Sequence, residues 1–154
     1  KGLGVGKDYA KAMQWYRKAI QEGDGSAAGV ARCSIGRFYH DGLGVAQDHR
    51  EAMRWYREAV EHGSDWALSN IGILYEHGFG VPKDPAEAMR FFRLAADKNL
   101  AEGMANVGRL YRDGTGVRQD ITEALRWFTR AAETDHGWAM TSIGALYHDG
   151  NGVG

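Results

Sequence analysis

One motif returns at a fixed interval along this chain, and that interval constrains the fold more than any other feature. The motif Tyr-x-Asp-Gly-x-Gly-Val-x-x-Asp is clearest over residues 111–120, and His77 replaces its first aspartate in one copy. The tyrosines that begin the copies are 36 residues apart: Tyr39, Tyr75, Tyr111 and Tyr147. A repeat of this length indicates an array of small units that bury their apolar faces against one another.

Each complete copy of the motif ends on an aspartate that precedes a segment with helical spacing. The carboxylate of such an aspartate accepts hydrogen bonds from the unpaired amides of a first helical turn, which makes it a good N-cap. The expected caps are Asp8, Asp48, Asp84 and Asp120. A glutamate three residues later predicts a capping box in all copies but the first, where Lys11 stands: Glu51, Glu87 and Glu123.

The helices expected after these caps share an alternation of alanine and a large ring. Each ring stands three residues after one alanine and four residues before another, so the three side chains lie on one helix face. The rings are Trp15, Trp55, Phe91 and Trp127. The alanines are Ala12, Ala19, Ala52, Ala59, Ala88, Ala95, Ala124 and Ala131. We expect this face to form the core between units.

A second helix is expected before each tyrosine, and it contains a glycine at the same place in every unit. The pairs are Ile35-Gly36, Ile71-Gly72, Val107-Gly108 and Ile143-Gly144. Glycine inside a helix costs about 1 kcal/mol relative to alanine, so its return indicates a neighbouring backbone that needs the space. The sequence thus predicts an all-α fold of four antiparallel helix pairs, about eight helices, in one repeat domain. The approximate units are residues 1–44, 45–80, 81–116 and 117–154.

One interval departs from the period. Trp15 and Trp55 are 40 residues apart, four more than the 36 that separate Trp55 from Phe91. The extra residues are expected within residues 23–29, as a lengthened loop that costs little stability. A projection specific to a partner is the alternative.

The pattern Ala-x-x-x-Ile-Gly-x-Leu-Tyr-x-x-Gly-x-Gly-Val-x-x-Asp-x-x-x-Ala-x-x-Trp/Phe, seen from Ala67 to Phe91, resembles the Sel-one-like repeat (SLR). The resemblance covers essentially the whole chain, and it implies a right-handed α-solenoid of the tetratricopeptide type. It also implies a non-enzymatic scaffold for protein complexes. Members of this family occur in bacterial envelope and secreted proteins and in eukaryotic endoplasmic-reticulum degradation complexes.

The composition of the chain argues against two classes of partner, nucleic acids and membranes. The chain has 19 Lys and Arg against 20 Asp and Glu, with no basic run, which argues against a nucleic-acid partner. No apolar run approaches the ~20 residues that cross a bilayer, so direct membrane insertion is not expected. Cys33 is the single cysteine, and no signal peptide is recognisable. Because the chain begins at Lys1 inside a repeated loop, we expect a fragment of a longer array.

The motifs that resemble chemical sites have a simpler structural interpretation. The glycine-rich residues 2–7 are followed by Asp8, whereas a phosphate-binding loop ends in Gly-Lys-Ser/Thr between a strand and a helix. The pairs His40-Asp41, Glu76-His77 and His148-Asp149 occupy equivalent positions in different units. Packed helices are ~8–10 Å apart and zinc–nitrogen bonds are only ~2.0–2.1 Å, so these pairs cannot share one ion without distortion. We expect no cofactor, no metal and no catalytic residue.

If tetratricopeptide geometry carries over, the second helices line a concave groove. Their outward positions, by spacing, are Ser34, Arg37, His40, Trp66, Asn70, Ile73, His77, Asn106, Arg109, Arg112, Trp138, Ser142 and His148. The resemblance implies that Asn70 and Asn106 form a ladder that holds a peptide main chain. Arg109 and Arg112 are expected to add a fork for a carboxylate. Ordinary solvated surface is the alternative for all four residues.

Trp66 and Trp138 lie outside the repeated core positions and are 72 residues apart, two full periods. Exposed tryptophans often anchor a partner, although these two could equally cover the joints between helix pairs. The predicted function is a scaffold that binds a peptide or a helix of a partner protein in the groove. The alternative is an architectural spacer or a segment that associates end to end with itself.

Overall fold

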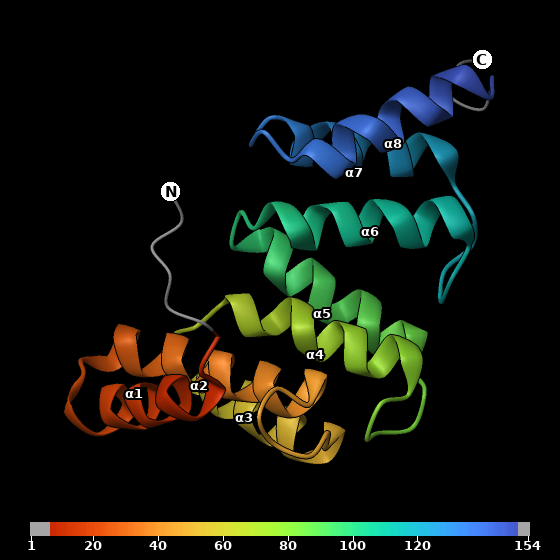
Figure 1. The fold of residues 1–154 in the computed structure, drawn as a ribbon. Helices are drawn as coiled ribbons and strands as arrows, with labels where there is room; N and C mark the ends of the chain where they lie inside the picture. The colour runs from red at the N-terminus through yellow and green to blue at the C-terminus, as the bar shows by residue number, and fades with distance from the viewer. Residues whose placement is uncertain (1–6, 151–154) are drawn as a thin grey trace. The chain divides into compact units, whose positions relative to one another are not determined.

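The computed structural model describes residues 7–150, and within that range the chain folds into eight α-helices without a strand (Figure 1). The helices are α1 (Tyr9–Glu22), α2 (Gly25–Asp41), α3 (His49–Glu61), α4 (Trp66–His77), α5 (Pro85–Asp97), α6 (Ala101–Asp113), α7 (Ile121–Ala132) and α8 (Gly137–His148). The expected number and class of elements are therefore confirmed. The chain forms two compact units, residues 1–67 and 68–154.

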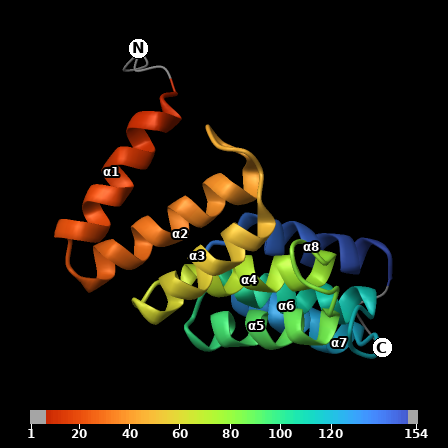
Figure 2. The ribbon, with the colours of Figure 1, turned by 90° about the horizontal axis from the view of Figure 1, so that it is seen from below.

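In the first unit, α2 lies between α1 and α3 (Figure 2). Its core on the α1 side is built from Met13, Ile35 and Phe38. The rings of Tyr9 and Tyr16 meet Phe38 edge to face, with centroids 5.7 and 5.6 Å away. Edge-to-face pairs of this kind add to the energy of area burial, so α1 and α2 form a tight hairpin.

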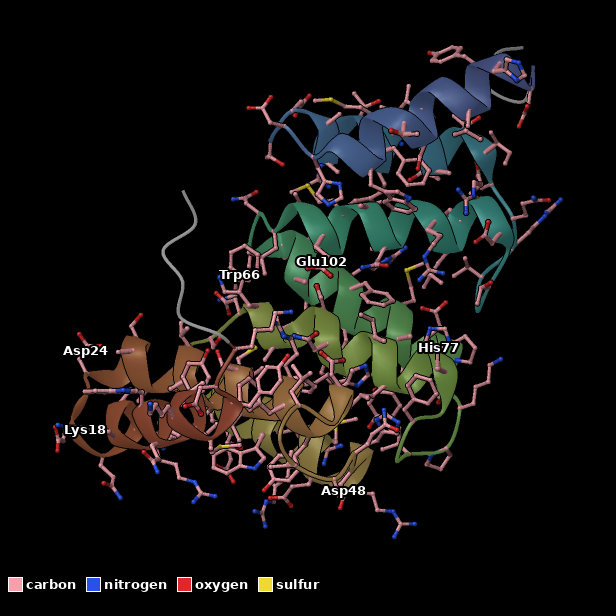
Figure 3. All side chains as sticks on the ribbon, viewed as in Figure 1. Lys18, Asp24, Asp48, Trp66, His77 and Glu102 are labelled. Carbon is pink, nitrogen blue, oxygen red and sulfur yellow. The ribbon has the colours of Figure 1, made fainter. Side chains whose placement is uncertain are left out.

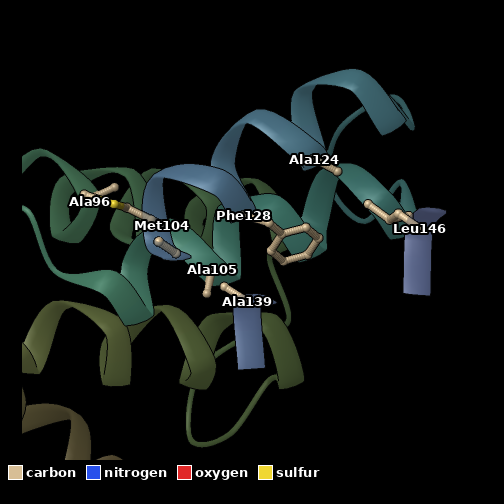
Figure 4. Close-up of a cluster of buried hydrophobic side chains, with 8 residues drawn as sticks. Ala96, Met104, Ala105, Ala124, Phe128, Ala139 and Leu146 are labelled. Atoms are coloured by element: carbon tan, nitrogen blue, oxygen red, sulfur yellow. The ribbon is translucent and has the colours of Figure 1, made fainter. Parts of the chain in front are cut away.

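In the second unit, the core is centred on two phenylalanines of the first helices. Phe92 of α5 packs with Val107 and Leu110 of α6. Phe128 of α7 lies in a cluster of alanines and longer side chains from α5, α6, α7 and α8, shown in Figure 4. Both rings are fully buried. Two apolar clusters thus hold α5, α6, α7 and α8 together.

The recurring glycines of the second helices receive these aromatic rings, whereas the sequence predicted a neighbouring backbone there. A Cβ added at Gly36 would lie 2.7 Å from the Tyr56 ring. At Gly72 it would lie 2.6 Å from Phe92, and at Gly108 it would lie 2.9 Å from Phe128. The neighbour that needs the space is therefore an aromatic side chain of the following first helix, rather than only its backbone.

The identity of the central ring differs from the prediction. Trp55, Phe91 and Trp127 are only half-buried, and Trp15 is 66% exposed. The fully buried rings are those of the next residues, Tyr56, Phe92 and Phe128. The reason is that Ala52, Met53 and Ala59 are all buried, and the stripe through these three passes through position 56, with position 55 at its edge. Burial raises the pKa of Tyr56 well above its ordinary value.

The repeated motif forms the loop between helix pairs, and a hydrogen bond between its first and last residues closes this loop. In the clearest copy, Gly114 ends α6 in the left-handed conformation at φ 67°, and the amide of Asp120 donates to the carbonyl of Tyr111 at 3.0 Å. The Asp120 carboxylate then accepts from the amide of Glu123 at 2.9 Å. All four predicted aspartate caps accept from the first turn of their helices.

The predicted capping box forms only in half. Its second half would use the glutamate to accept from the cap amide, but that amide already donates to the tyrosine carbonyl of the same motif. The glutamates instead bind arginines three residues later: Glu51 with Arg54 at 2.6 Å, Glu87 with Arg90 at 2.9 Å and Glu123 with Arg126 at 2.6 Å. These pairs lie on the exposed side of the first helices.

The four extra residues of the first repeat are not a loop. The second helix α2 has 17 residues, whereas α4 has 12 and α6 has 13. Asp24 caps the added turn by accepting from the amide of Ala27 at 2.9 Å. A lengthened loop was therefore the wrong expectation, because Asp24 provides a helix start in front of residues that the helix can absorb.

Candidate functional site

A pocket of about 280 Å³ lies between α6 and the beginning of α8. Its lining residues come from α6, from α8 and from the residue that caps α8: Glu102, Ala105, Asn106, Arg109, His136 and Trp138. Ala105 is buried and forms the floor, while the longer side chains form the walls. The sequence had assigned Asn106, Arg109 and Trp138 to one groove, and the structure places these three around one pocket.

Trp138 is partly packed and partly open. One edge of its ring meets Phe128 with centroids 5.6 Å apart, and His136 lies 6.4 Å away on another side. The residue nevertheless remains 42% exposed. His136 caps α8 by accepting from the amide of Ala139 at 3.3 Å, which fixes it beside the tryptophan. Phe128 and His136 therefore hold the Trp138 ring in place, and Trp138 also lines the pocket.

The position of Asn106 returns in the repeats as Ser34, Asn70 and Ser142, and it has a structural role. The Asn106 amide donates to the carbonyl of Glu102 at 3.0 Å, one turn earlier in its own helix. Ser34 and Ser142 bind Val30 and Trp138 in the same way, each at 3.0 Å. One N–H of the Asn106 amide is thus engaged inside the helix, and its second N–H is available for a ligand.

Arg109 has a carboxylate partner within the chain. Its guanidinium donates to both oxygens of Glu76 in α4, at 2.7 and 2.6 Å, and to the side-chain oxygen of Asn106 at 3.2 Å. Glu76 is buried, and Arg109 is half-buried. These hydrogen bonds raise the pKa of Arg109, while burial opposes the shift. Arg112 likewise binds Asp113, at 2.7 Å.

The fork expected from Arg109 and Arg112 for a ligand carboxylate is therefore occupied by Glu76 and Asp113. The partner of Arg109 lies 33 residues earlier, in a different helix, so the spacing of α6 alone does not indicate it. In the structure, the Arg109–Glu76 pair is a brace between α4 and α6. It fixes the wall of the pocket on the Asn106 side.

Replacing Glu76 by glutamine is expected to lower the free energy of unfolding by about 1 kcal/mol, since half-buried Arg109 then lacks its anionic partner. Asp113→Asn, which removes the more exposed partner of Arg112, serves as the matched control and should change stability by less than about 0.5 kcal/mol. Urea unfolding at neutral pH measures both. Because the pKa of Arg109 is raised, its contribution is fully present at neutral pH and is lost only in strongly alkaline solution. An equal cost for the two variants would contradict the bracing role.

Two of the predicted groove residues belong to the packing instead. Ile73 packs against the cluster around Phe92. Ser142 is buried, between Ala139 and Leu146 on the same face of α8. Ser142 occupies the repeat position of Asn106, but the short serine side chain is buried and donates to the carbonyl of Trp138, whereas the longer Asn106 reaches the pocket.

The other predicted residues are spread along the second helices. Trp66 is exposed at the start of α4, and Asn70 is half-buried one turn later. Figure 3 shows His77 at the carboxyl end of α4 and Glu102 near the amino end of α6. His77 is exposed and its ring lies 5.2 Å from that of Phe79. The structure gives no arrangement that brings Asn70 or His77 into the pocket.

Glu102 and His136 complete the pocket but were not predicted. Glu102 occupies the position of Trp66 and Trp138 in its own repeat, and that equivalence was the available signal. His136 lies before α8, outside any helical face, so no periodicity could have selected it. Ala105 was passed over because alanine carries no chemistry, although it supplies the floor.

Among residues 7–150, no group of three or more His, Cys, Asp or Glu side chains is placed to hold a metal ion. His40 lies against the ring of His49, with centroids 5.1 Å apart, and His148 lies beside Asp149. No helix in the described part of the chain has the length and apolarity to span a membrane. The glycine-rich residues 2–6 lie outside the described residues.

Known proteins and protein families resemble this chain along its repeats. The family model for the Sel1 repeat matches residues 1–24, 29–64, 67–100 and 101–136. A Sel1 repeat protein from Oxalobacter formigenes is 36% identical, with a TM-score of 0.81 over 95% of this chain and 58% of that chain. A protective antigen present in uropathogenic Escherichia coli strains, with an SLR fold, is also 36% identical, with a TM-score of 0.81 over 99% of this chain and 32% of that one.

A third structure, Helicobacter pylori cysteine rich protein B, shares the fold at 24% identity, with a TM-score of 0.63 over 92% of this chain and 98% of that chain. No curated protein matches the sequence. The chain spans less than two thirds of the two more similar solved chains. The solenoid fold class predicted from the repeats is confirmed, and the chain belongs to the Sel1 repeat family.

Proposed function

We propose that this chain is a non-enzymatic scaffold that binds a peptide or a helix of a partner protein over α6 and α8. Sel1 repeat proteins are in general scaffolds for protein interactions. The observation that carries the finer proposal is the pocket in which exposed Trp138 faces Asn106 and Glu102. Both kinds of contact that a peptide needs, an apolar anchor and main-chain hydrogen bonding, meet there.

The openness of the pocket supports a protein ligand. Sites for small molecules and cofactors commonly surround most of the ligand. The pocket here, of about 280 Å³, is open to solvent, so it suits one or two side chains of a larger partner. Trp138 offers a large rigid surface, the kind of residue that supplies most of the energy in protein interfaces.

The polar groups around Trp138 give the ligand an orientation. The free N–H of Asn106 can donate to a main-chain carbonyl, and the Glu102 carboxylate can accept from an amide or bind a basic side chain. Arg109 stays with Glu76 and keeps Asn106 in place. Because the walls are fixed before the ligand arrives, the ligand bears most of the cost of ordering.

Replacing Trp138 by alanine is expected to weaken peptide binding by at least about tenfold, since truncating a central aromatic anchor costs about 2 kcal/mol or more. The probe is a peptide selected from a random 12-residue library against the immobilised chain. Its dissociation constant is measured by fluorescence anisotropy for the original chain and for each variant.

Trp15→Ala is the matched control, because Trp15 is an exposed tryptophan outside this pocket. We expect this variant to bind like the original chain, and Asn106→Ala to bind about three- to tenfold more weakly through loss of one hydrogen bond. Selected peptides that bind Trp138→Ala with unchanged affinity, while circular dichroism shows full helicity, would remove the pocket from the proposal.

A further inference from the structure

The charges around the pocket of α6 and α8 do not balance. Among the lining residues, Arg109 is neutralised by the two oxygens of Glu76, at 2.7 and 2.6 Å. His136 accepts from the amide of Ala139 through Nδ1, as the neutral form of its ring does. The carboxylate of Glu102 is therefore the remaining full charge that the lining presents to a ligand.

Glu102 is open to solvent although further helices follow its own. α7 and α8 come after α6 in the same compact unit, and Glu102 is nevertheless exposed and lines the pocket. In the repeats, its equivalent in α8 is Trp138. This repeat position therefore stays open when another helix pair packs on its helix, and the pocket combines the acidic residue of one repeat with the tryptophan of the next.

A contact within the chain shows which side chain fits an aromatic ring beside a carboxylate. The guanidinium carbon of Arg90 lies 4.5 Å from the centroid of Phe91, and the same guanidinium donates to both oxygens of Glu87, at 3.1 and 2.9 Å. Arg130 lies over the ring of Trp127 at the same distance of 4.5 Å. Arginine can make both contacts at once because its guanidinium is planar and carries its donors in a fixed fork.

We infer that the pocket takes an arginine side chain, with its guanidinium over the ring of Trp138 and hydrogen-bonded to the carboxylate of Glu102. This side chain belongs to the peptide of the proposed function, on which the inference rests. The pocket, of about 280 Å³ and open to solvent, accommodates it from the solvent side. Arg109 does not repel the guanidinium, because Glu76 balances its charge. The side-chain amide of Asn106 stays available to the main chain of the same peptide.

The test uses peptides that are selected from the random library against the original chain and whose binding Trp138→Ala weakens. Each should contain an arginine whose replacement by citrulline, a neutral side chain of nearly the same shape, weakens binding about tenfold. Replacing the same arginine by lysine should weaken binding about threefold, because lysine keeps the charge but not the planar stacking. Fluorescence anisotropy measures the dissociation constants.

Glu102→Gln tests whether this carboxylate makes the contact. The variant should bind the arginine peptide about two- to fivefold more weakly and the citrulline peptide with unchanged affinity. Glu133→Gln is the matched control, because Glu133 is an exposed acidic residue that does not line the pocket. It should bind both peptides like the original chain, and circular dichroism checks that both variants keep their helicity.

Three results would overturn the inference and leave the proposed function standing. Peptides that need Trp138 could bind equally well with citrulline in place of arginine, or equally well with lysine. An arginine peptide could also bind the Glu102→Gln chain as tightly as the original chain. Selection that yields no peptide dependent on Trp138 would instead remove the proposed function, and the inference with it.

Discussion

Replacing Phe128 by alanine is expected to lower the free energy of unfolding by about 3–5 kcal/mol, the range for a large buried ring truncated in a core. Phe128 is fully buried between α6, α7 and α8. Its removal takes away apolar burial, the edge-to-face contact with Trp138 and the filling of the space above Gly108. Because α6 and α8 pack against the same ring, neither side can close the cavity without moving the other.

Urea unfolding followed by circular dichroism measures this effect, and Trp127→Ala is the matched control. Trp127 is the adjacent aromatic residue, half-buried, with Arg130 over its ring at 4.5 Å. We expect it to cost clearly less than Phe128→Ala. If Trp127→Ala is the more destabilising of the two, the ring chosen from the sequence pattern would be the central one and the structural assignment would be wrong.

Gly108→Ala is expected to destabilise the chain by about 1–2 kcal/mol, whereas Gly144→Ala, at the equivalent position of α8, should stabilise it by about 0.5–1 kcal/mol. The added methyl group at 108 would lie 2.9 Å from Phe128 and 3.1 Å from the carbonyl of Ala124, and this crowding outweighs the gain in helix propensity. At 144 no described atom lies within 4 Å, so only the gain remains.

Thermal and urea unfolding at low protein concentration measure the expected loss of stability in Gly108→Ala and the expected gain in Gly144→Ala. A double variant tests whether the Phe128 ring causes the loss. In a chain that already carries Phe128→Ala, Gly108→Ala should destabilise clearly less, because the ring is gone and only the Ala124 carbonyl still crowds the added methyl group. If Gly108→Ala costs the same in both backgrounds, the conflict lies with the backbone of α7 rather than with the ring.

The helix starts and the joints could be predicted because they depend on local chemistry that returns every 36 residues. Asp120 and its equivalents cap their helices whatever packs above them. The cost of Gly108 inside a helix indicates a crowded position, although the sequence predicted a backbone where the Phe128 ring lies. Both inferences use one helix at a time.

The errors lie where a second helix decides the outcome. Trp127 and Phe128 are both apolar and adjacent, and only the position of α6 and α8 determines which of them is fully buried. The second half of the capping box is absent for a similar reason. The amide of Asp120 donates to the carbonyl of Tyr111, nine residues earlier in α6, so it does not donate to Glu123. The residue spacing within one helix predicts neither which ring is buried nor which carbonyl accepts from the cap amide.

The pocket was predicted in part. Trp138 stood out because it departs from the repeated core, and Asn106 stood out by its spacing. The partner of Arg109 was missed, because pairing with Glu76 across 33 residues depends on how α4 and α6 pack. Because Arg109 pairs with Glu76, the proposed binding surface is reduced to Trp138, Asn106 and Glu102.

The most direct measurement of the central claim is an NMR titration of the ¹⁵N-labelled chain with the selected peptide. The chain has five tryptophans, and each indole N–H gives a separate resonance that single replacements can assign. We predict that the Trp138 indole and the Asn106 side-chain amide shift together along the titration, while the Trp15 indole stays in place. Saturation of the peptide complex with both pocket resonances unmoved would contradict binding over α6 and α8.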